Sequence, residues 1–239
     1  MKVFLMYYDR YQSATTSLML DREHIVLCHS NKEMFTCISN KATVIETGLP
    51  KGIQNNFNYG LSLLEDGEWG IFMSDDLVCG RELTGKNFTR VDHNYVLDVF
   101  INKVNKIQNN RINLIGMNAT GNELNSTREV STFGLVDGRC FAIRKTEFTF
   151  HPHIQTIPDY YATAYHLEKY GTNLVFNHFF LDFKRYHSGG LGTSDDRLEQ
   201  KKKDIRTLIS LFPDTVKIMD KKSQPKGSHV VIKYKRARK

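Results

Sequence analysis

The sequence predicts an α/β fold in a single domain, in which helices flank a mostly parallel sheet. The first half of the chain alternates short apolar runs with amphipathic stretches, which is the pattern of βαβ units. Each run is short and bounded by polar residues, as buried parallel strands tend to be. The 239 residues fit one large domain, and a hydrophobic content of 40% is enough for a core without disulfides.

The expected elements follow in chain order. Strands are expected at 3–7, 25–28, 42–45 and 69–73, with helices at 15–20, 32–38 and 52–65. The helix at 52–65 is the clearest, because its apolar residues share one face at helical spacing: Ile53, Phe57, Leu61 and Leu64. Beyond it we expect a helix at 95–108, a loop at 109–129, strands at 140–143 and 174–180, and helices at 160–170 and 197–211. The run 230–234 could add a late strand.

Positive charge is concentrated at the C-terminal end of the chain. Residues 217–239 contain nine Lys and Arg and one Asp, a net charge of +8, whereas residues 1–216 carry −1. We therefore expect a folded domain over 1–216 and a basic arm over 217–239. Such an arm indicates a polyanionic partner such as nucleic acid, and the alternative is a solvated tail that aids solubility.

Composition also excludes several classes of protein. No run approaches the roughly 18 apolar residues of a membrane span, and the apolar start over 1–8 is too short for a signal peptide. The four cysteines lie far apart without a CxxC pair, so neither a disulfide framework nor a zinc site is indicated. We expect a soluble, cytoplasmic protein.

Two adjacent carboxylates, Asp75 and Asp76, follow Ser74 at the end of the strand expected at 69–73. Ligands of open α/β sheets bind beyond the carboxyl ends of the strands. Burying two unpaired charges there would be costly. The pair is therefore suited to a hard cation whose shell is completed by substrate phosphates. The alternative is a polar turn at the strand end.

Four further polar residues are candidates for a site. Asn55 and Asn56 open the helix at 52–65, where their amides either cap the helix or reach a nucleotide. Asp159 precedes the helix at 160–170 and is either a helix cap or a general base. His187 lies in a glycine-rich loop and is a candidate metal ligand, although a single loop histidine is more often neither ligand nor base.

The order of these motifs resembles the GT-A class of nucleotide-sugar glycosyltransferases. The resemblance covers about residues 1–215 and is carried by Tyr8-Asp9-Arg10, Asn55-Asn56, Phe72-Met73-Ser74-Asp75-Asp76, 137–144, Pro158-Asp159-Tyr160 and His187. More narrowly, the segments 186–190 and 211–213 with Arg197 between them are similar to the TET-associated glycosyltransferases of phages. Those enzymes are associated with sugar modification of hydroxymethylated pyrimidines in DNA.

The resemblance implies a metal-dependent glycosyltransferase with a GT-A-like sheet. It implies a nucleotide-sugar donor, with a UDP-sugar expected, and Mn²⁺ or Mg²⁺ as the metal. Asp76 and His187 would ligate the metal, and Asp159 would be the catalytic base. Ser74 stands where the family has the first Asp of its DxD motif. The residues implied to bind the nucleotide sugar are Tyr8, Arg10, Asn55, Asn56 and Asp75.

The acceptor implied by the resemblance is a hydroxymethylated or already glycosylated pyrimidine in DNA, held by the basic arm inside a phage-infected bacterial cell. Two alternatives remain open. One is a glycosyltransferase that acts on a glycan or a protein. The other is a non-catalytic nucleic-acid-binding protein in which the acidic pair is only a turn. No membrane partner is expected, and the sequence does not predict an oligomeric state.

Overall fold

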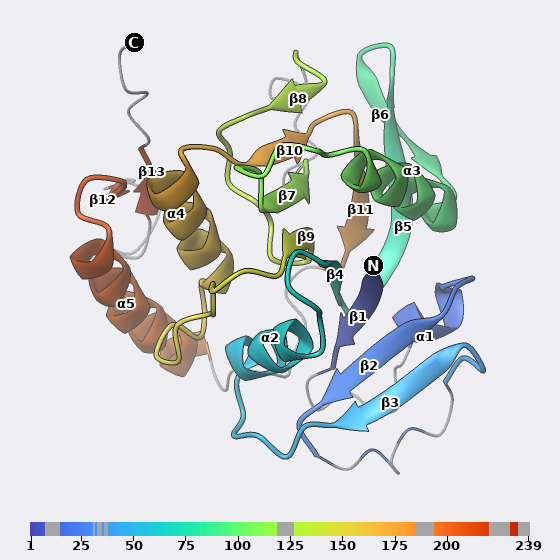
Figure 1. The fold of residues 1–239 in the computed structure, drawn as a ribbon, viewed down its shortest axis with the longest axis horizontal. Coiled ribbons are helices and arrows are strands. Elements are labelled where there is room, and N and C mark those ends of the chain that lie inside the picture. The colour runs from blue at the N-terminus through green and yellow to red at the C-terminus, as the bar shows by residue number, and fades with distance from the viewer. Residues whose placement is uncertain are drawn as a thin grey trace.

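An eight-stranded sheet forms the centre of the fold (Figure 1). The computed structural model describes residues 1–7, 15–30, 32, 35, 38–118, 127–184, 194–219 and 230–233. The strands lie in the order β3-β2-β1-β4-β9-β7-β10-β8. Their bounds are β1 Lys2–Met6, β2 His24–Cys28, β3 Ala42–Glu46, β4 Trp69–Ser74, β7 Leu114–Met117, β8 Val130–Ser131, β9 Cys140–Arg144 and β10 Leu174–Phe176. Only β9 and β8 pair antiparallel with their neighbours, so the predicted mostly parallel sheet is confirmed.

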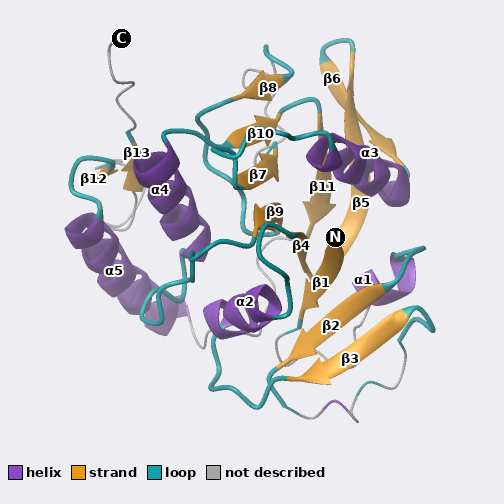
Figure 2. Cartoon of the chain, in the orientation of Figure 1, coloured by secondary structure: helices purple, strands orange, loops and turns teal. Residues whose placement is uncertain are grey.

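Helices cover both faces of this sheet (Figure 2). On one face lie α1 (Thr15–Met19) and α3 (His93–Asn105), and on the other lie α2 (Ile53–Ser62) and α4 (Pro158–Tyr170). Outside α4 lies α5 (Ser194–Leu211), which shares a separate apolar cluster with it. None of the helices in the described ranges combines the length and the apolar content that crossing a bilayer requires.

The strand residues alternate between the two apolar layers, as a period of two residues requires. In β1, Phe4 and Met6 face the layer of α2 and α4, whereas Val3 and Leu5 face the layer of α3. The ring of Phe72 in β4 stacks on Phe4, with 5.0 Å between the ring centroids. A Cβ on Gly60 of α2 would lie 2.6 Å from the Phe72 ring, so a glycine is needed for this close helix–sheet approach.

We expect Phe72→Ala to lower the free energy of unfolding by about 3–5 kcal/mol, because it leaves a large cavity in a close-packed core. The Phe72 side chain is fully buried and contacts the rings of Phe4, Phe57 and Phe141. Chemical denaturation followed by circular dichroism measures the change. Phe88→Ala is the control, since Phe88 is only partly buried, and equal losses for the two variants would contradict this account of the core.

Two smaller sheets complete the fold. One has the order β11-β5-β6, formed by β11 (Phe179–Phe183), β5 (Leu77–Thr84) and β6 (Asn87–Val91). The other pairs β12 (Val216–Ile218) with β13 (Val230–Ile232), so the late strand expected at 230–234 is present. Val216 and Val230 are buried against α5, and the boundary expected between residues 216 and 217 falls inside β12.

Several elements differ from the sequence-based expectation. The loop expected at 109–129 contains β7, a fully buried run of only four residues that polar residues flank. The single strand expected at 174–180 is two strands in different sheets, because the Asn177 side chain bonds Arg128 O and Ser131 Oγ where the chain turns. The hairpin of β5 and β6 was not predicted, and it carries charged residues in its strands. Most of the helix expected at 32–38 lies outside the described residues.

Candidate active site

Several polar segments meet at the carboxyl edge of the main sheet. The parallel strands β1 and β4 end there together, with Met6 in register with Ser74. Because β9 runs antiparallel to β4, the residues before β9 arrive at the same edge, and Ser74 N donates a 2.8 Å hydrogen bond to Arg139 O. This is the edge at which open α/β sheets bind ligands.

The acidic pair follows β4 at this edge, as predicted. Asp75 is 5% exposed, whereas Asp76 is half-exposed and accepts a 2.8 Å hydrogen bond from Ser74 Oγ on its Oδ1 atom. The carbonyl of Asp76 accepts a bond from Lys184 N, the last described residue before 194. Of the two carboxylates, Asp76 is therefore the more accessible.

The donor set around Asp76 fits a divalent cation that is shared with substrate. Within the described part of the chain, no three His, Cys, Asp or Glu side chains gather into a potential metal cage. Mg²⁺ is commonly bound through one or two carboxylates, with phosphate oxygens and waters completing its shell. One accessible carboxylate beside a hydroxyl at a strand end is compatible with that mode of binding. His187, the second predicted ligand, lies outside the described residues, as do Tyr8 and Arg10.

Asp137 and Arg139 form a two-point ion pair just before β9. Arg139 Nε lies 2.9 and 3.0 Å from the two carboxylate oxygens of Asp137, and a terminal guanidinium nitrogen also contacts this carboxylate. Hydrogen bonding to Asp137 raises the pKa of Arg139, and the charges of Asp182 and Asp76 raise it further. The guanidinium thus lies among three carboxylates near the strand end.

Asp159 lies in the first turn of α4, which begins at Pro158. It is half-buried, and its carboxylate accepts hydrogen bonds from backbone N–H groups, including those of Tyr160 and Gly138. Burial, and then the nearby charge of Asp137, raise the pKa of Asp159 to about 7, although these hydrogen bonds oppose the rise. A Cβ on Gly138 would lie 3.1 Å from the Asp159 Cβ, so the glycine permits the close approach of the two segments.

A cavity of about 410 Å³ joins these segments. Figure 1 shows its surroundings, where α2, the start of α4 and the orange amino end of α5 come together. The residues that line the cavity are Met6, Ile53, Phe57, Ser74, Asp137, Gly138, Arg139, Gln155, Thr156, Pro158, Asp159 and Arg197. The structure therefore brings the strand end at Ser74 and the predicted base together. Asp75 and Asp76 adjoin the cavity through Ser74 and are not among its lining residues.

The two asparagines of α2 make local contacts. Asn55 Nδ2 donates to Pro50 O at 2.9 Å, and Asn56, which is 2% exposed, accepts a 3.3 Å bond from Thr47 Oγ1. Both contacts fix the connection between β3 and α2. Neither residue lines the cavity around Asp159, and their role in nucleotide binding stays a prediction.

Three residues of the site were assigned no chemical role from the sequence: Asp137, Arg139 and Arg197. The segment 137–144 and Arg197 entered only as motifs that carry the resemblance. The spacing Asp-x-Arg just before a predicted strand is the signal that could have marked the first two, since a carboxylate and a guanidinium two residues apart can pair. Arg197 lines the cavity from α5, and nothing in the local sequence reports that contact.

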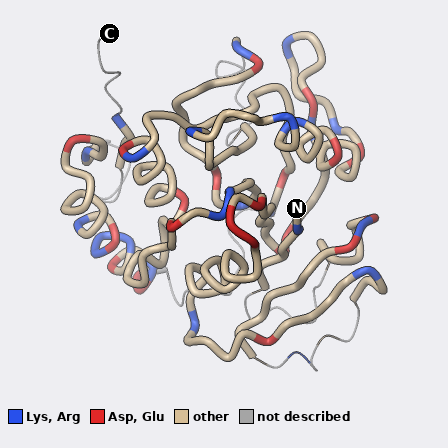
Figure 3. Tube along the Cα trace, viewed as in Figure 1, with Lys and Arg blue, Asp and Glu red and all other residues tan. Residues whose placement is uncertain are grey.

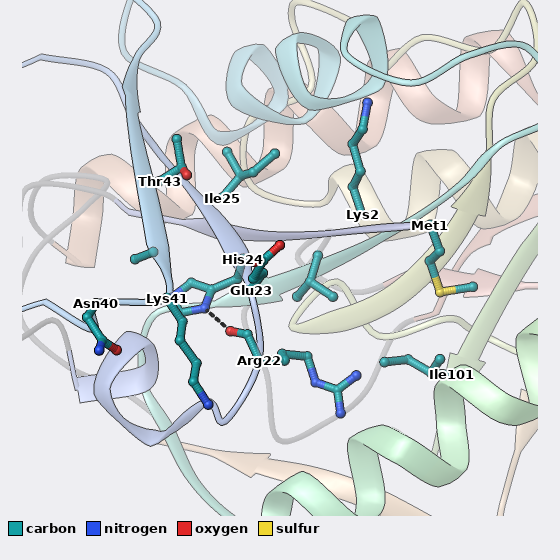
Figure 4. Close-up of a pocket in the computed structure, with 12 residues that line it drawn as sticks. Met1, Lys2, Arg22, Glu23, His24, Ile25, Asn40, Lys41, Thr43 and Ile101 are labelled. Atoms are coloured by element: carbon teal, nitrogen blue, oxygen red, sulfur yellow. Dashed lines mark hydrogen bonds between the residues drawn. The ribbon is translucent and has the colours of Figure 1, made fainter.

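A second cavity, of about 660 Å³, lies at the opposite edge of the sheet, by the amino ends of β1, β2 and β3 (Figure 4). Its cationic side chains already have acidic partners, since Arg22 pairs with Asp98 and Lys41 pairs with Asp21. The ring of His24 is bonded to Arg22 O at 2.8 Å. None of the predicted site residues lines this cavity, and parallel sheets bind ligands at the other edge.

Comparison with known proteins supports the fold. No protein-family model matches the sequence, and no curated protein sequence is similar to it. The solved structures of similar fold include two crystal structures with a TM-score of 0.53. One is a mycobacterial protein with 12% identity, covering 96% of this chain and 82% of that one. The other is glucosyl-3-phosphoglycerate synthase from Mycobacterium tuberculosis in complex with Mn²⁺ and UDP-glucose, with 11% identity, covering 91% and 81%.

A third structure, S. aureus TarS, has a TM-score of 0.45 and 14% identity, covering 87% of this chain and 40% of TarS. The likeness to the synthase confirms the predicted GT-A-like fold, a single domain in which helices flank a mostly parallel sheet.

Proposed function

We propose that this chain is a metal-dependent glycosyltransferase that moves a sugar from a nucleotide sugar, with a UDP-sugar as the expected donor, to a hydroxymethylated or already glycosylated pyrimidine in DNA. The observation that carries the proposal is Asp159. Its carboxylate lines a cavity at the carboxyl edge of a GT-A-like sheet, and its pKa is about 7. A group with a pKa near the working pH is suited to remove a proton from a hydroxyl.

In the proposed reaction, the acceptor hydroxyl displaces the diphosphate at the anomeric carbon of the donor sugar. The hydroxyl oxygen forms the new glycosidic bond, and its proton passes to Asp159. The bond from the anomeric carbon to the diphosphate breaks, and the electron pair leaves with the diphosphate. Gly138 and the start of α4 hold the Asp159 carboxylate in place, while burial and then the charge of Asp137 keep its pKa raised.

Asp76 is the residue that we propose to hold the divalent metal, Mn²⁺ or Mg²⁺, with His187 as a second ligand. Ser74 Oγ orients the Asp76 carboxylate. The synthase of similar fold was solved with Mn²⁺ and UDP-glucose, which supports the same combination of metal and donor here. When bound, such a metal supplies charge stabilisation for the departing diphosphate. The donor-binding residues that we propose are Tyr8, Arg10, Asn55, Asn56 and Asp75.

The charge of the C-terminal part supports a polyanionic acceptor. Figure 3 shows Lys and Arg positions along α5, which are Arg197, Lys201, Lys202, Lys203 and Arg206. Lys217 and Lys233 follow on or next to the β12–β13 pair, which packs against α5. A run of cations binds a phosphate backbone without reading its sequence. We propose that this surface and the arm hold the DNA acceptor.

Incubation with radiolabelled UDP-sugars and DNA that contains 5-hydroxymethylcytosine tests the function. We expect label in the modified DNA and none in the same DNA with ordinary cytosine, and we expect a chelator to abolish the transfer. Mass spectrometry of the released nucleosides identifies the product. Transfer only to a glycan or protein would favour the alternative acceptor class. Failure to turn over any nucleotide sugar would favour a non-catalytic binding protein.

Charge reversal in the basic arm tests its contact with DNA. Changing Lys235, Arg236, Arg238 and Lys239 to Glu leaves β13 intact, which truncation at residue 217 would not. Each phosphate contact contributes about −0.9 to the slope of log Kobs against log salt concentration. We therefore expect the slope to flatten by roughly three to four units, with donor binding unchanged.

The matched control reverses four exposed cations elsewhere and so has the same net charge: Lys86, Arg90, Lys106 and Arg111. Salt slopes for DNA binding are compared among the two variants and the wild type. Parallel slopes for the arm variant and the wild type would show that the arm does not contact DNA.

A further inference from the structure

The cavity around Asp159 has two arginines, and they differ in their surroundings. Arg139 is held by the carboxylate of Asp137. Arg197 is exposed in the first turns of α5, and within the described ranges no carboxylate lies within ion-pair distance of it. The Arg197 guanidinium is therefore not held in an ion pair by any carboxylate that the structure describes, in contrast to Arg139.

The position of Arg197 is fixed by a buried carboxylate on the same helix. Asp204 is fully buried and accepts hydrogen bonds from Gln155 N at 3.0 Å and from Thr156 N at 2.6 Å. The side chains of Thr156 and Gln200 also donate to it, at 2.6 and 2.7 Å. This carboxylate ties α5 to the segment that leads directly into Asp159.

Arg197 and Asp204 are on nearly the same face of α5. Residues seven apart in an α-helix lie two turns apart and about 20° from alignment. The face of α5 that Asp204 ties to residues 155 and 156 is thus the face from which Arg197 reaches the cavity. Asp204 acts as a positioning residue for the guanidinium.

We propose that Arg197 binds a phosphate group of the acceptor, beside the hydroxyl that Asp159 deprotonates. This inference rests on the proposed function. A guanidinium presents donors in a planar fork that matches the oxygens of a phosphate. In a pyrimidine nucleotide, the C5 substituent and the 5′ phosphate lie on the same side. If the hydroxymethyl group of the acceptor lies at Asp159, the 5′ phosphate of the same nucleotide would therefore lie toward the wall of the cavity.

The donor diphosphate is the other possible source of a phosphate at Arg197. The acceptor is favoured because the proposed metal ligand, Asp76, is not among the residues that line this cavity, whereas the proposed base is. We therefore place the donor diphosphate at Asp76, whereas Arg197 lines the same cavity as Asp159.

Calorimetric titration of the full-length protein, saturated with Mn²⁺ and UDP, tests the proposal without requiring turnover. The two probes are 5-hydroxymethyl-2′-deoxycytidine and its 5′-monophosphate. We expect the wild type to prefer the monophosphate and Arg197→Gln to lose that preference, with a roughly 10- to 100-fold weaker affinity for the monophosphate. Affinity for the nucleoside should be unchanged.

Arg111→Gln is the matched control, because it makes the same substitution at an exposed arginine outside the cavity and outside the surface proposed to hold DNA. The proposal is overturned if the wild type binds both probes equally, or if the control loses as much affinity as Arg197→Gln. It is also overturned if Arg197→Gln weakens UDP binding instead, which would assign the phosphate to the donor. Transfer assays on the same samples test the proposed function separately. If the wild type prefers the monophosphate but transfers no sugar, Arg197 is a phosphate site and the proposed glycosyltransferase activity is wrong.

Discussion

Asp159→Asn is expected to lower kcat by roughly 10²–10⁴-fold while leaving KM for the donor nearly unchanged. Asparagine has almost the same shape, and it can still accept the backbone hydrogen bonds that hold the Asp159 side chain. It cannot take up the proton of the acceptor hydroxyl. Steady-state kinetics with varied donor and acceptor measure both parameters.

The same variant also changes the pH dependence. In the wild type, kcat/KM for the acceptor should rise as the pH increases through about 7, because a carboxylate is a base only when it is ionised and the pKa of Asp159 is about 7. The rise should be absent in Asp159→Asn. Asp66→Asn, which changes an exposed turn carboxylate, is the control. Equal kcat values for Asp159→Asn and the wild type would reduce Asp159 to a residue that stabilises the start of α4.

Asp76→Ala is expected to weaken metal-dependent UDP binding by more than about 100-fold with the protein still folded. Even changes to the outer partners of metal ligands cost roughly 10–100-fold in affinity, and the ligand itself should matter more. Because Asp76 is half-exposed at a strand end, its removal leaves no cavity in the core. Calorimetry with UDP, in the presence and absence of Mn²⁺, measures the change.

Ser74→Ala provides a graded comparison for Asp76→Ala. It removes only the 2.8 Å bond that orients the Asp76 carboxylate, so its loss of metal-dependent affinity should be smaller. Asp66→Ala again serves as the control for loss of a distant carboxylate. If Asp76→Ala binds UDP with the metal as tightly as the wild type, Asp76 does not hold the metal.

The parts of the fold that the sequence predicts are those that local periodicity determines. The runs that became β1, β2 and β4 are apolar on both faces, because both faces of their sheet are covered by helices or by the smaller sheet. The β5–β6 hairpin has no such run, since its exposed positions carry polar side chains. The strand β7 is too short to be distinguished from the polar segment around it, and only its pairing with β9 and β10 identifies it.

In the candidate site, too, some residues are predictable from local sequence and others are brought together only by the fold. Ser74, Asp75 and Asp76 are predictable, because polar residues at the end of a buried strand lie at a known edge of the sheet. The raised pKa of Asp159 depends on burial and on Asp137, which is 22 residues earlier in the chain and comes close only in the fold. The entry of Arg197 into the cavity likewise depends on the contact of Asp204 with residues 155 and 156, which no sequence pattern reports.

The antiparallel pairing of β9 with β4 has a consequence for biosynthesis. These strands are neighbours at the centre of the sheet, yet 65 residues separate Ser74 from Cys140. At synthesis rates of about 5–20 residues per second, the ribosome needs roughly 3–13 s to make that segment. During this time the nascent chain carries β4, an apolar strand, with one edge unpaired, and such edges are where chains aggregate. Slower translation between β4 and β9 should therefore lower the soluble yield of this protein, and chaperones that shield the open edge of β4 should restore it.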